Sequence, residues 1–119
     1  MSTNELAAYK EKLLDLRARL IQALGVETVH VLVDRSLEEV LTVYPGLAAI
    51  QRENDDLNLD GLDEVYQDRP EEEVRAAFSA LYAVMLLMLA RMLGNEIALR
   101  LAGTIDARRV LEGDELAPR

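Results

Sequence analysis

The longest apolar stretch of the chain runs from Ala76 to Ala90, and Ser79 is its single polar residue. A surface helix of a soluble protein normally keeps one polar face toward water. A helix over this stretch has almost no polar face, so it must be buried on nearly all sides. The pattern therefore predicts a central apolar helix around which the rest of a small domain is built.

Signals on both sides of the stretch give this helix its predicted limits. Pro70 suits a first helical turn, and the three glutamates at 71–73 favour the positive end of the helix dipole. Gly94 is the first residue beyond the stretch that favours a kink or a break. We expect one long helix over 69–103, with a kink at position 94.

The N-terminal segment 1–24 carries a second helical pattern. Its apolar positions recur at alternating spacings of three and four, as in the seam of a coiled coil, and the seam is too short to specify a coiled coil by itself. We expect a helix that packs either on its own domain or, as a dimer stalk, on a copy of itself. The seam consists of Leu6, Tyr9, Leu13, Leu16 and Leu20.

A third pattern, over 26–44, has one apolar face and one charged face and predicts an amphipathic helix. The Pro45-Gly46 pair ends it, because proline cannot continue the helical hydrogen bonds. Polar and apolar residues then alternate, which is typical of strands, and residues 53–56 have the composition of a turn. We favour an antiparallel hairpin within 47–60; the alternative is a helix that continues through 47–53.

Towards the C-terminus, the pattern predicts a short helix over 104–112 and a frayed tail over 113–119. With 119 residues and half of them apolar, the chain has the size of one domain with a core of its own. The predicted fold class is mainly α with a small antiparallel β-hairpin (α+β).

The charge distribution limits the partners that we expect. The formal net charge is −9, and the acidic residues concentrate between Glu53 and Glu73, which we interpret as a solvated surface. No basic stripe is present, so we expect no nucleic-acid binding.

Two further absences bear on location. The chain has no cysteine, which suits a reducing cytoplasm, and its first residues lack the pattern of a signal peptide. The apolar run at 76–90 is shorter than a bilayer span and has charged residues on both flanks. We therefore expect a cytoplasmic protein without membrane insertion.

One motif resembles the start of a calcium-binding loop. Residues 56–61 read Asp-Leu-Asn-Leu-Asp-Gly, the D-x-N-x-D-G opening of an EF-hand. The second half does not follow that pattern, because Gln67 stands where a bidentate glutamate belongs. A strand followed by a glycine turn is the favoured interpretation, and calcium binding is the less favoured one.

His30 is the single histidine, and it forms an E-x-x-H motif with Glu27. One such motif supplies too few ligands for a di-iron site, so we expect a hydrogen bond from His30 to Glu27 or Asp34. A nucleophile paired with a base is not evident, nor is a glycine-rich phosphate loop. We therefore expect no catalytic residues, no metal and no cofactor.

The methionines of the apolar helix share one face with two leucines. Methionine is flexible and polarizable, so such a face suits self-association or an apolar ligand as well as core packing. These considerations favour a non-enzymatic interaction or regulatory module that acts as a homodimer; the alternative is a sensor with a Met/Leu-lined pocket. The residues assigned to the interface or lining are Leu81, Met85, Met88, Leu89 and Met92.

Overall fold

The computed structural model describes residues 3–53 and 56–102, so the predicted helix at 104–112 and the predicted tail at 113–119 lie outside the described residues. The described residues form five α-helices, one 3-10 helix and two short strands. In chain order they are α1 (Thr3–Leu24), α2 (Val26–Leu41), η1 (Pro45–Ala49), β1 (Gln51–Glu53), β2 (Asp56–Asn58), α3 (Gly61–Tyr66), α4 (Glu71–Leu93) and α5 (Asn95–Ala102). The predicted class, mainly α with a small antiparallel hairpin, is confirmed.

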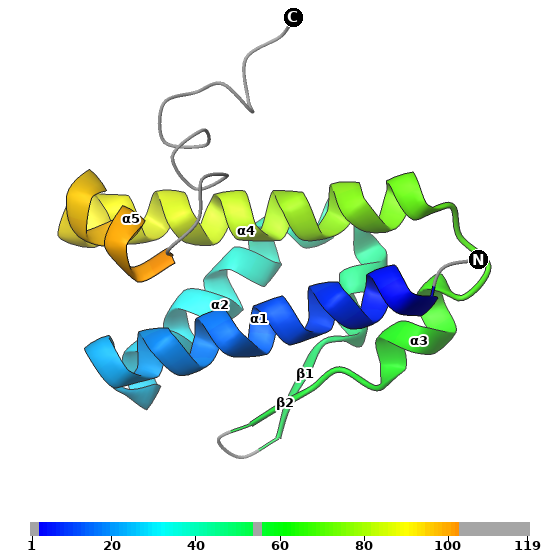
Figure 1. Ribbon diagram of the computed structural model, residues 1–119, viewed down its shortest axis with the longest axis horizontal. Coiled ribbons are helices and arrows are strands. Elements are labelled where there is room, and N and C mark those ends of the chain that lie inside the picture. The colour runs from blue at the N-terminus through cyan, green and yellow to red at the C-terminus, as the bar shows by residue number, and fades with distance from the viewer. Residues whose placement is uncertain (1–2, 54–55, 103–119) are drawn as a thin grey trace, which may run out of the picture.

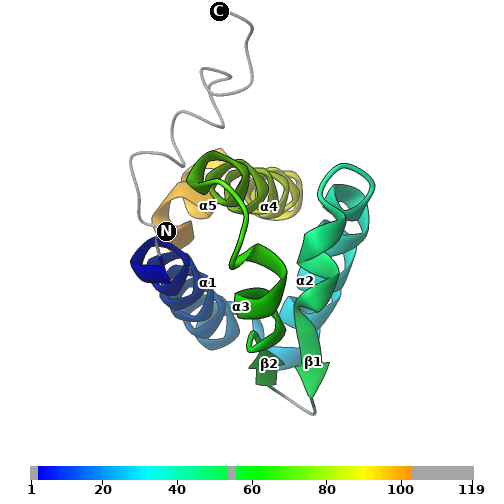
Figure 2. The same ribbon diagram turned by 90° about the vertical axis from the view of Figure 1, so that its right-hand side faces the viewer.

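Three long helices form a bundle around one hydrophobic core. α1 and α4 run in the same direction and α2 runs opposite to both (Figure 1). Seen along the bundle, the hairpin and α3 fill the side between α1 and α2, away from α4 (Figure 2). Two ion pairs tie this side together, from Arg52 of β1 to Asp34 of α2 at 3.4 Å and from Lys10 of α1 to Asp63 of α3 at 3.1 Å.

The boundaries differ from the predicted ones at several points. α2 ends at Leu41 instead of residue 44, and 45–49 form a 3-10 helix, so the alternative of a continued helix was partly right at 47–49. The hairpin is correspondingly shorter than 47–60, with Gln51 opposite Asn58 and Glu53 opposite Asp56. A helix following Pro45 can form here because proline fits the first turn, where its missing N–H is not needed.

The expected long helix over 69–103 is two helices, because the chain breaks fully at Gly94. Gly94 has φ 91° and ψ 158°, and Gly25 between α1 and α2 has nearly the same conformation, φ 88° and ψ 155°. This region of backbone space is essentially restricted to glycine. At each joint the glycine N–H donates to the preceding helix and its carbonyl accepts from the next one, so a single residue turns the corner.

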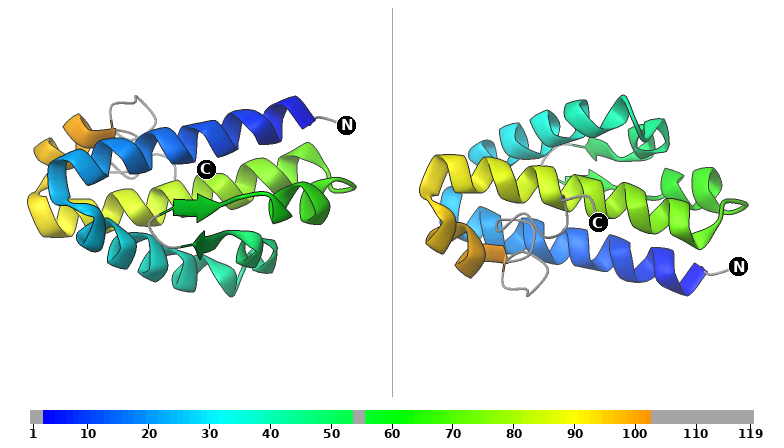
Figure 3. Two further views of the ribbon diagram at one scale, coloured as in Figure 1. Left: turned by 90° about the horizontal axis from the view of Figure 1, so that it is seen from below. Right: turned by 90° about the horizontal axis from the view of Figure 1, so that it is seen from above.

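The N-terminal seam packs into the domain's own core. Leu6, Leu13 and Leu20 are buried, and Tyr9 and Leu16 are half-buried against the same core. The ring of Tyr9 stacks on Phe78 of α4 with centroids 5.2 Å apart. α1 lies along the bundle in every view (Figures 1 and 3). Of the two alternatives left open from sequence, the structure therefore shows packing on the domain itself and not a dimer stalk.

The far end of α1 holds α5. The guanidinium of Arg19 donates hydrogen bonds to the backbone carbonyls of Leu101 and Ala102, at 3.3 and 3.1 Å, and so covers the last carbonyls of α5. α5 thus folds back beside α4 and α1. These contacts leave one long side of α4, the side away from α1 and α2, without a described element on it (Figure 2).

Candidate interaction surface

The five residues assigned from sequence to an interface or ligand lining are divided by the structure between core and surface. Leu81, Met85 and Leu89 are buried between α4 and the rest of the bundle, with 1% or less of their surface exposed. A side chain without exposed area cannot contact a partner unless the fold opens. These three residues are therefore part of the core.

The two remaining methionines lie nearer the surface. Met88 is half-buried, and its sulfur accepts a hydrogen bond of 3.6 Å from the hydroxyl of Ser36, a fully buried serine of α2. Met92 is 52% exposed at the end of α4. The predicted Met/Leu face is thus mainly buried, with Met88 in contact with α2 and with Met92 as its most exposed residue.

A different side of the same helix carries apolar residues that stay partly exposed. Single large apolar side chains are also exposed on other helices, among them Leu14, Val31 and Ile97. We call this side of α4 the outer stripe: four apolar residues that follow one another at spacings of four, four and three and that all keep part of their surface exposed. Two of them, Ala76 and Leu87, do not pack against the buried core at all. The outer stripe consists of Ala76, Ala80, Val84 and Leu87.

Opposite charges stand at the two ends of the outer stripe. Glu73 precedes it by one turn, Arg91 follows it by one turn, and no charged residue lies between Ala76 and Ala90. Glu73 and Arg91 are eighteen positions apart, which is about five complete turns at 3.6 residues per turn, so both lie in line with the stripe. Arg91 makes no ion pair with the part of the chain that the structure describes, whereas Glu73 accepts a hydrogen bond of 3.0 Å from Arg69.

Sequence reasoning missed this stripe because a helix that is apolar all round has no polar side to reveal its orientation. The five-turn spacing of Glu73 and Arg91 was the available signal. Charges at both ends of an apolar run indicate a side along which the helix can reach water, although Glu71, Glu72 and Arg75 lie on other sides of it.

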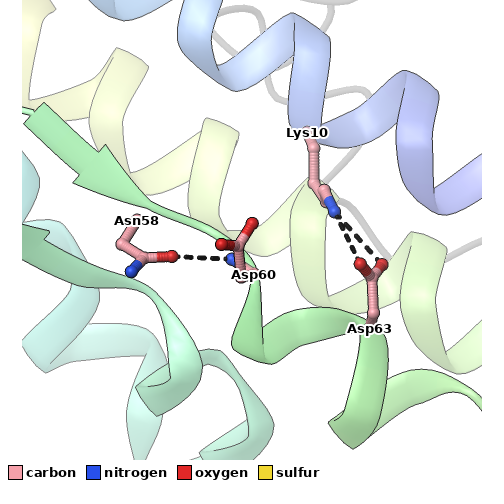
Figure 4. A network of polar contacts seen from close by, with 4 residues as sticks. All are labelled: Lys10, Asn58, Asp60 and Asp63. Carbon is pink, nitrogen blue, oxygen red and sulfur yellow. Dashed lines mark hydrogen bonds and ion pairs between the residues drawn. The ribbon is translucent and has the colours of Figure 1, made fainter.

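The calcium-like segment forms a strand and a helix start instead of a ligand loop. Asp56 and Asn58 belong to β2, and the side-chain oxygen of Asn58 accepts a 2.9 Å hydrogen bond from the backbone N–H of Asp60 (Figure 4). The Asn58 amide nitrogen in turn donates to Glu53 at 3.0 Å. Asn58 is thus engaged in a local turn that leads into α3.

The side chain of Asp63 contacts an amine instead of a cation site. Both of its carboxylate oxygens lie 3.1 Å from the Lys10 amine on α1 (Figure 4). Among the described residues, no three histidine, aspartate or glutamate side chains are grouped closely enough to hold a metal ion.

A hollow of about 340 Å³ lies beside this segment, between α1 and the hairpin. It contains none of the five residues proposed from sequence as a Met/Leu lining. Four of the seven residues around it are polar or charged, which does not suit a purely apolar ligand. They are Lys10, Leu14, Glu53, Leu57, Asn58, Leu59 and Asp60.

His30 is half-buried on α2, and its predicted hydrogen bond to Glu27 or Asp34 does not form. Asp34 pairs with Arg52 instead, at 3.4 Å. The Nε2 atom of His30 is buried and has no hydrogen-bond partner within the described ranges 3–53 and 56–102. A carboxylate that would orient this imidazole as a catalytic base is therefore not in contact with it in the described structure.

Length and composition alone would allow one described helix, α4, to cross a membrane. The core helix of a soluble protein can have the same length and composition. Here α4 packs against α2, α1 and α5 over most of its length. Its apolar character is accounted for by that core on one side and leaves the outer stripe on the other.

The geometry thus contains a partly exposed apolar stripe on α4, bracketed by opposite charges, and a set of polar contacts that stabilise the hairpin side. Comparison of the chain with protein families, with curated proteins and with solved structures gave no match. Any functional conclusion therefore depends on the surface itself.

Proposed function

We propose that the protein is a non-enzymatic interaction or regulatory module of the cytoplasm, that it acts as a homodimer, and that the outer stripe of α4 is its dimer surface. The observation that carries the proposal is the combination of length and lack of charge in the stripe. Apolar residues on three successive turns remain partly exposed, on a helix whose opposite side packs in the core. Contiguous apolar surface of this kind is typical of protein–protein contacts.

A second copy of the chain is the partner that the surface fits best. The stripe is straight, and three of its four residues are small or β-branched, which allows another helix to approach closely. Its two ends carry opposite charges, so the surface is complementary to itself in one orientation. Most soluble oligomers are homo-oligomers with twofold symmetry, whose interface uses the same surface on both subunits.

The structure also changes which variants test a dimer. Replacing Leu89 with arginine would place a charge in the core and unfold the domain, because Leu89 is 1% exposed. Leu87→Arg places the charge in the outer stripe and leaves the core intact. The matched control is Ser79→Arg, an exposed position of the same helix that lies about a quarter turn away from the stripe.

The experiment is light scattering coupled to size exclusion at tens of micromolar protein, with circular dichroism of each variant. We expect a dimer for the wild type and for Ser79→Arg, and a folded monomer for Leu87→Arg. A monomeric wild type, or a Leu87→Arg protein that stays dimeric, would contradict the proposal.

A further inference from the structure

From the outer stripe we infer the arrangement of the dimer: the two copies of α4 pack antiparallel, with the twofold axis passing between them at the level of Tyr82 and with Glu73 of each copy beside Arg91 of the other. This inference rests on the proposed dimer and adds its direction and register. The two can fail separately.

The order of residues along the stripe carries the register. Counted from position 82, the stripe reads alike in both directions: Ala80 and Val84 are equally distant, and so are Glu73 and Arg91. Reversing one helix against the other places Ala80 opposite Val84 and Ala76 within one residue of Leu87. A small side chain then faces a larger one at each level, which allows the two surfaces to interlock.

The charges carry the direction. In an antiparallel pair each end of the interface brings one glutamate next to one arginine. A parallel pair would instead place Glu73 beside Glu73 and Arg91 beside Arg91, which is repulsive at both ends. Glu73 and Arg91 lie on the same side of α4 because whole turns separate them. A twofold axis perpendicular to the helices preserves that side, so Glu73 of one copy and Arg91 of the other lie on the same side of the interface.

The groups at the ends are available for this contact. Arg91 is exposed and has no ion-pair partner within the part of the chain that the structure describes. Glu73 already accepts from Arg69 at 3.0 Å, but a carboxylate has about four acceptor sites and can take a second arginine. The partner's Arg91 would then share Glu73 with Arg69.

Cysteine pairing tests the direction, because the chain has no cysteine of its own. Ala76→Cys and Leu87→Cys chains are refolded together and oxidised, and each is also oxidised alone. The antiparallel register brings these two positions within disulfide reach, about 4–7 Å between Cα atoms. Two Ala76→Cys residues would be separated by about twelve residues along the helix, roughly 18 Å. We expect a disulfide-linked mixed dimer and almost no linked Ala76→Cys dimer.

Charge reversal tests the pairing. Glu73→Arg and Arg91→Glu each convert two attractive contacts per dimer into repulsive ones, so each should raise the dissociation constant about tenfold. The double variant Glu73→Arg/Arg91→Glu restores two opposite pairs and should return the constant to within about threefold of the wild type. In a parallel dimer the double variant would gain nothing over the wild type, and the single variants would not be weakened.

The outcomes separate the two proposals. A dimer in which Ala76→Cys links to itself overturns the antiparallel register, and so does a dimer in which neither cysteine links, since it must use another surface. A monomeric wild type overturns the dimer and the register together. In that case, slow labelling of Ala76→Cys by a thiol reagent would indicate that something other than a second copy covers the stripe.

Discussion

The phenol of Tyr82 on α4 donates a 2.9 Å hydrogen bond to the backbone carbonyl of Tyr9 on α1. The ring of Tyr9 also stacks on Phe78, one turn before Tyr82 on α4. Tyr9 therefore connects α1 to α4 through both its backbone carbonyl and its side chain. Burial raises the pKa of Tyr82 well above its usual range, and the nearby phenol of Tyr9 raises it further.

This environment predicts a loss of stability at alkaline pH. Above the usual tyrosine pKa of about 10 the unfolded chain loses the Tyr82 proton while the folded chain keeps it. Stability is therefore full below pH 10 and falls as the pH rises toward the folded-state value. Tyr82→Phe should make that fall shallower and cost about 1 kcal/mol at neutral pH for the lost hydrogen bond.

The measurement is urea unfolding of both proteins between pH 7 and pH 11. Burial also raises the pKa of Tyr66, so part of the alkaline slope should remain in the variant. An unchanged slope in Tyr82→Phe would show that Tyr82 does not cause the alkaline loss.

The joint between α4 and α5 consists of Gly94 alone, so we expect the added methyl group of Gly94→Ala to lower stability strongly. Gly94→Ala forces an L-residue into a backbone conformation that is essentially restricted to glycine, at a cost of about 1–3 kcal/mol. Steric crowding does not cause this loss of stability, because no neighbouring atom lies within 4 Å of the position that a Cβ would take. Ser79→Ala, in an exposed helical position, is the control and should be nearly neutral. Equal stability of Gly94→Ala and wild type in thermal unfolding would refute the backbone argument.

Because Met85 is buried and Met92 is exposed, replacing each with alanine should change stability by very different amounts. Met85 is fully buried and Met92 is 52% exposed. Met85→Ala should cost about 2–5 kcal/mol because it leaves a cavity in the core. Met92→Ala should stay within about 0.5 kcal/mol of the wild type. The measurement is denaturant unfolding of the two variants. Similar losses of stability for both would contradict the assignment of Met85 to the core and of Met92 to the surface.

The turn at Asn58 predicts a structural role and no response to calcium. Asn58→Ala removes the acceptor for the Asp60 N–H and should cost about 0.5–2 kcal/mol, by analogy with a lost helix cap. Asp56→Ala, on an exposed strand position, should have little effect. Addition of millimolar calcium should leave the melting temperature of the wild type unchanged. A calcium-dependent rise that both variants abolish would restore the ligand-loop interpretation.

Several elements could be predicted from sequence because their signals are local. The amphipathic patterns predicted α1 and α2, and the proline and the glutamates predicted the start of α4. Gly94 was expected to kink the helix, and the structure shows a full break there. Alternation and turn composition gave the hairpin, although not its length. Its limits depend on η1, which forms where the chain packs against α3, and local pattern does not contain that contact.

The candidate surface could not be read from the same patterns. Leu81, Met85 and Leu89 are as apolar as Leu87, and nothing in their residue types separates core from surface. The N-terminal seam shows the same limit, because a seam that packs on its own domain has the spacing of one that packs on a second chain.

The sequence by itself determined the three long helices, the presence of a hairpin and the requirement that the apolar helix be covered, because backbone propensity, turn chemistry and hydrophobic period act over a few residues. The tertiary structure alone decided which side of α4 is core and which is the outer stripe. That choice depends on where α1, α2 and α5 lie, and their positions follow from burying the largest apolar area together, which no single segment specifies.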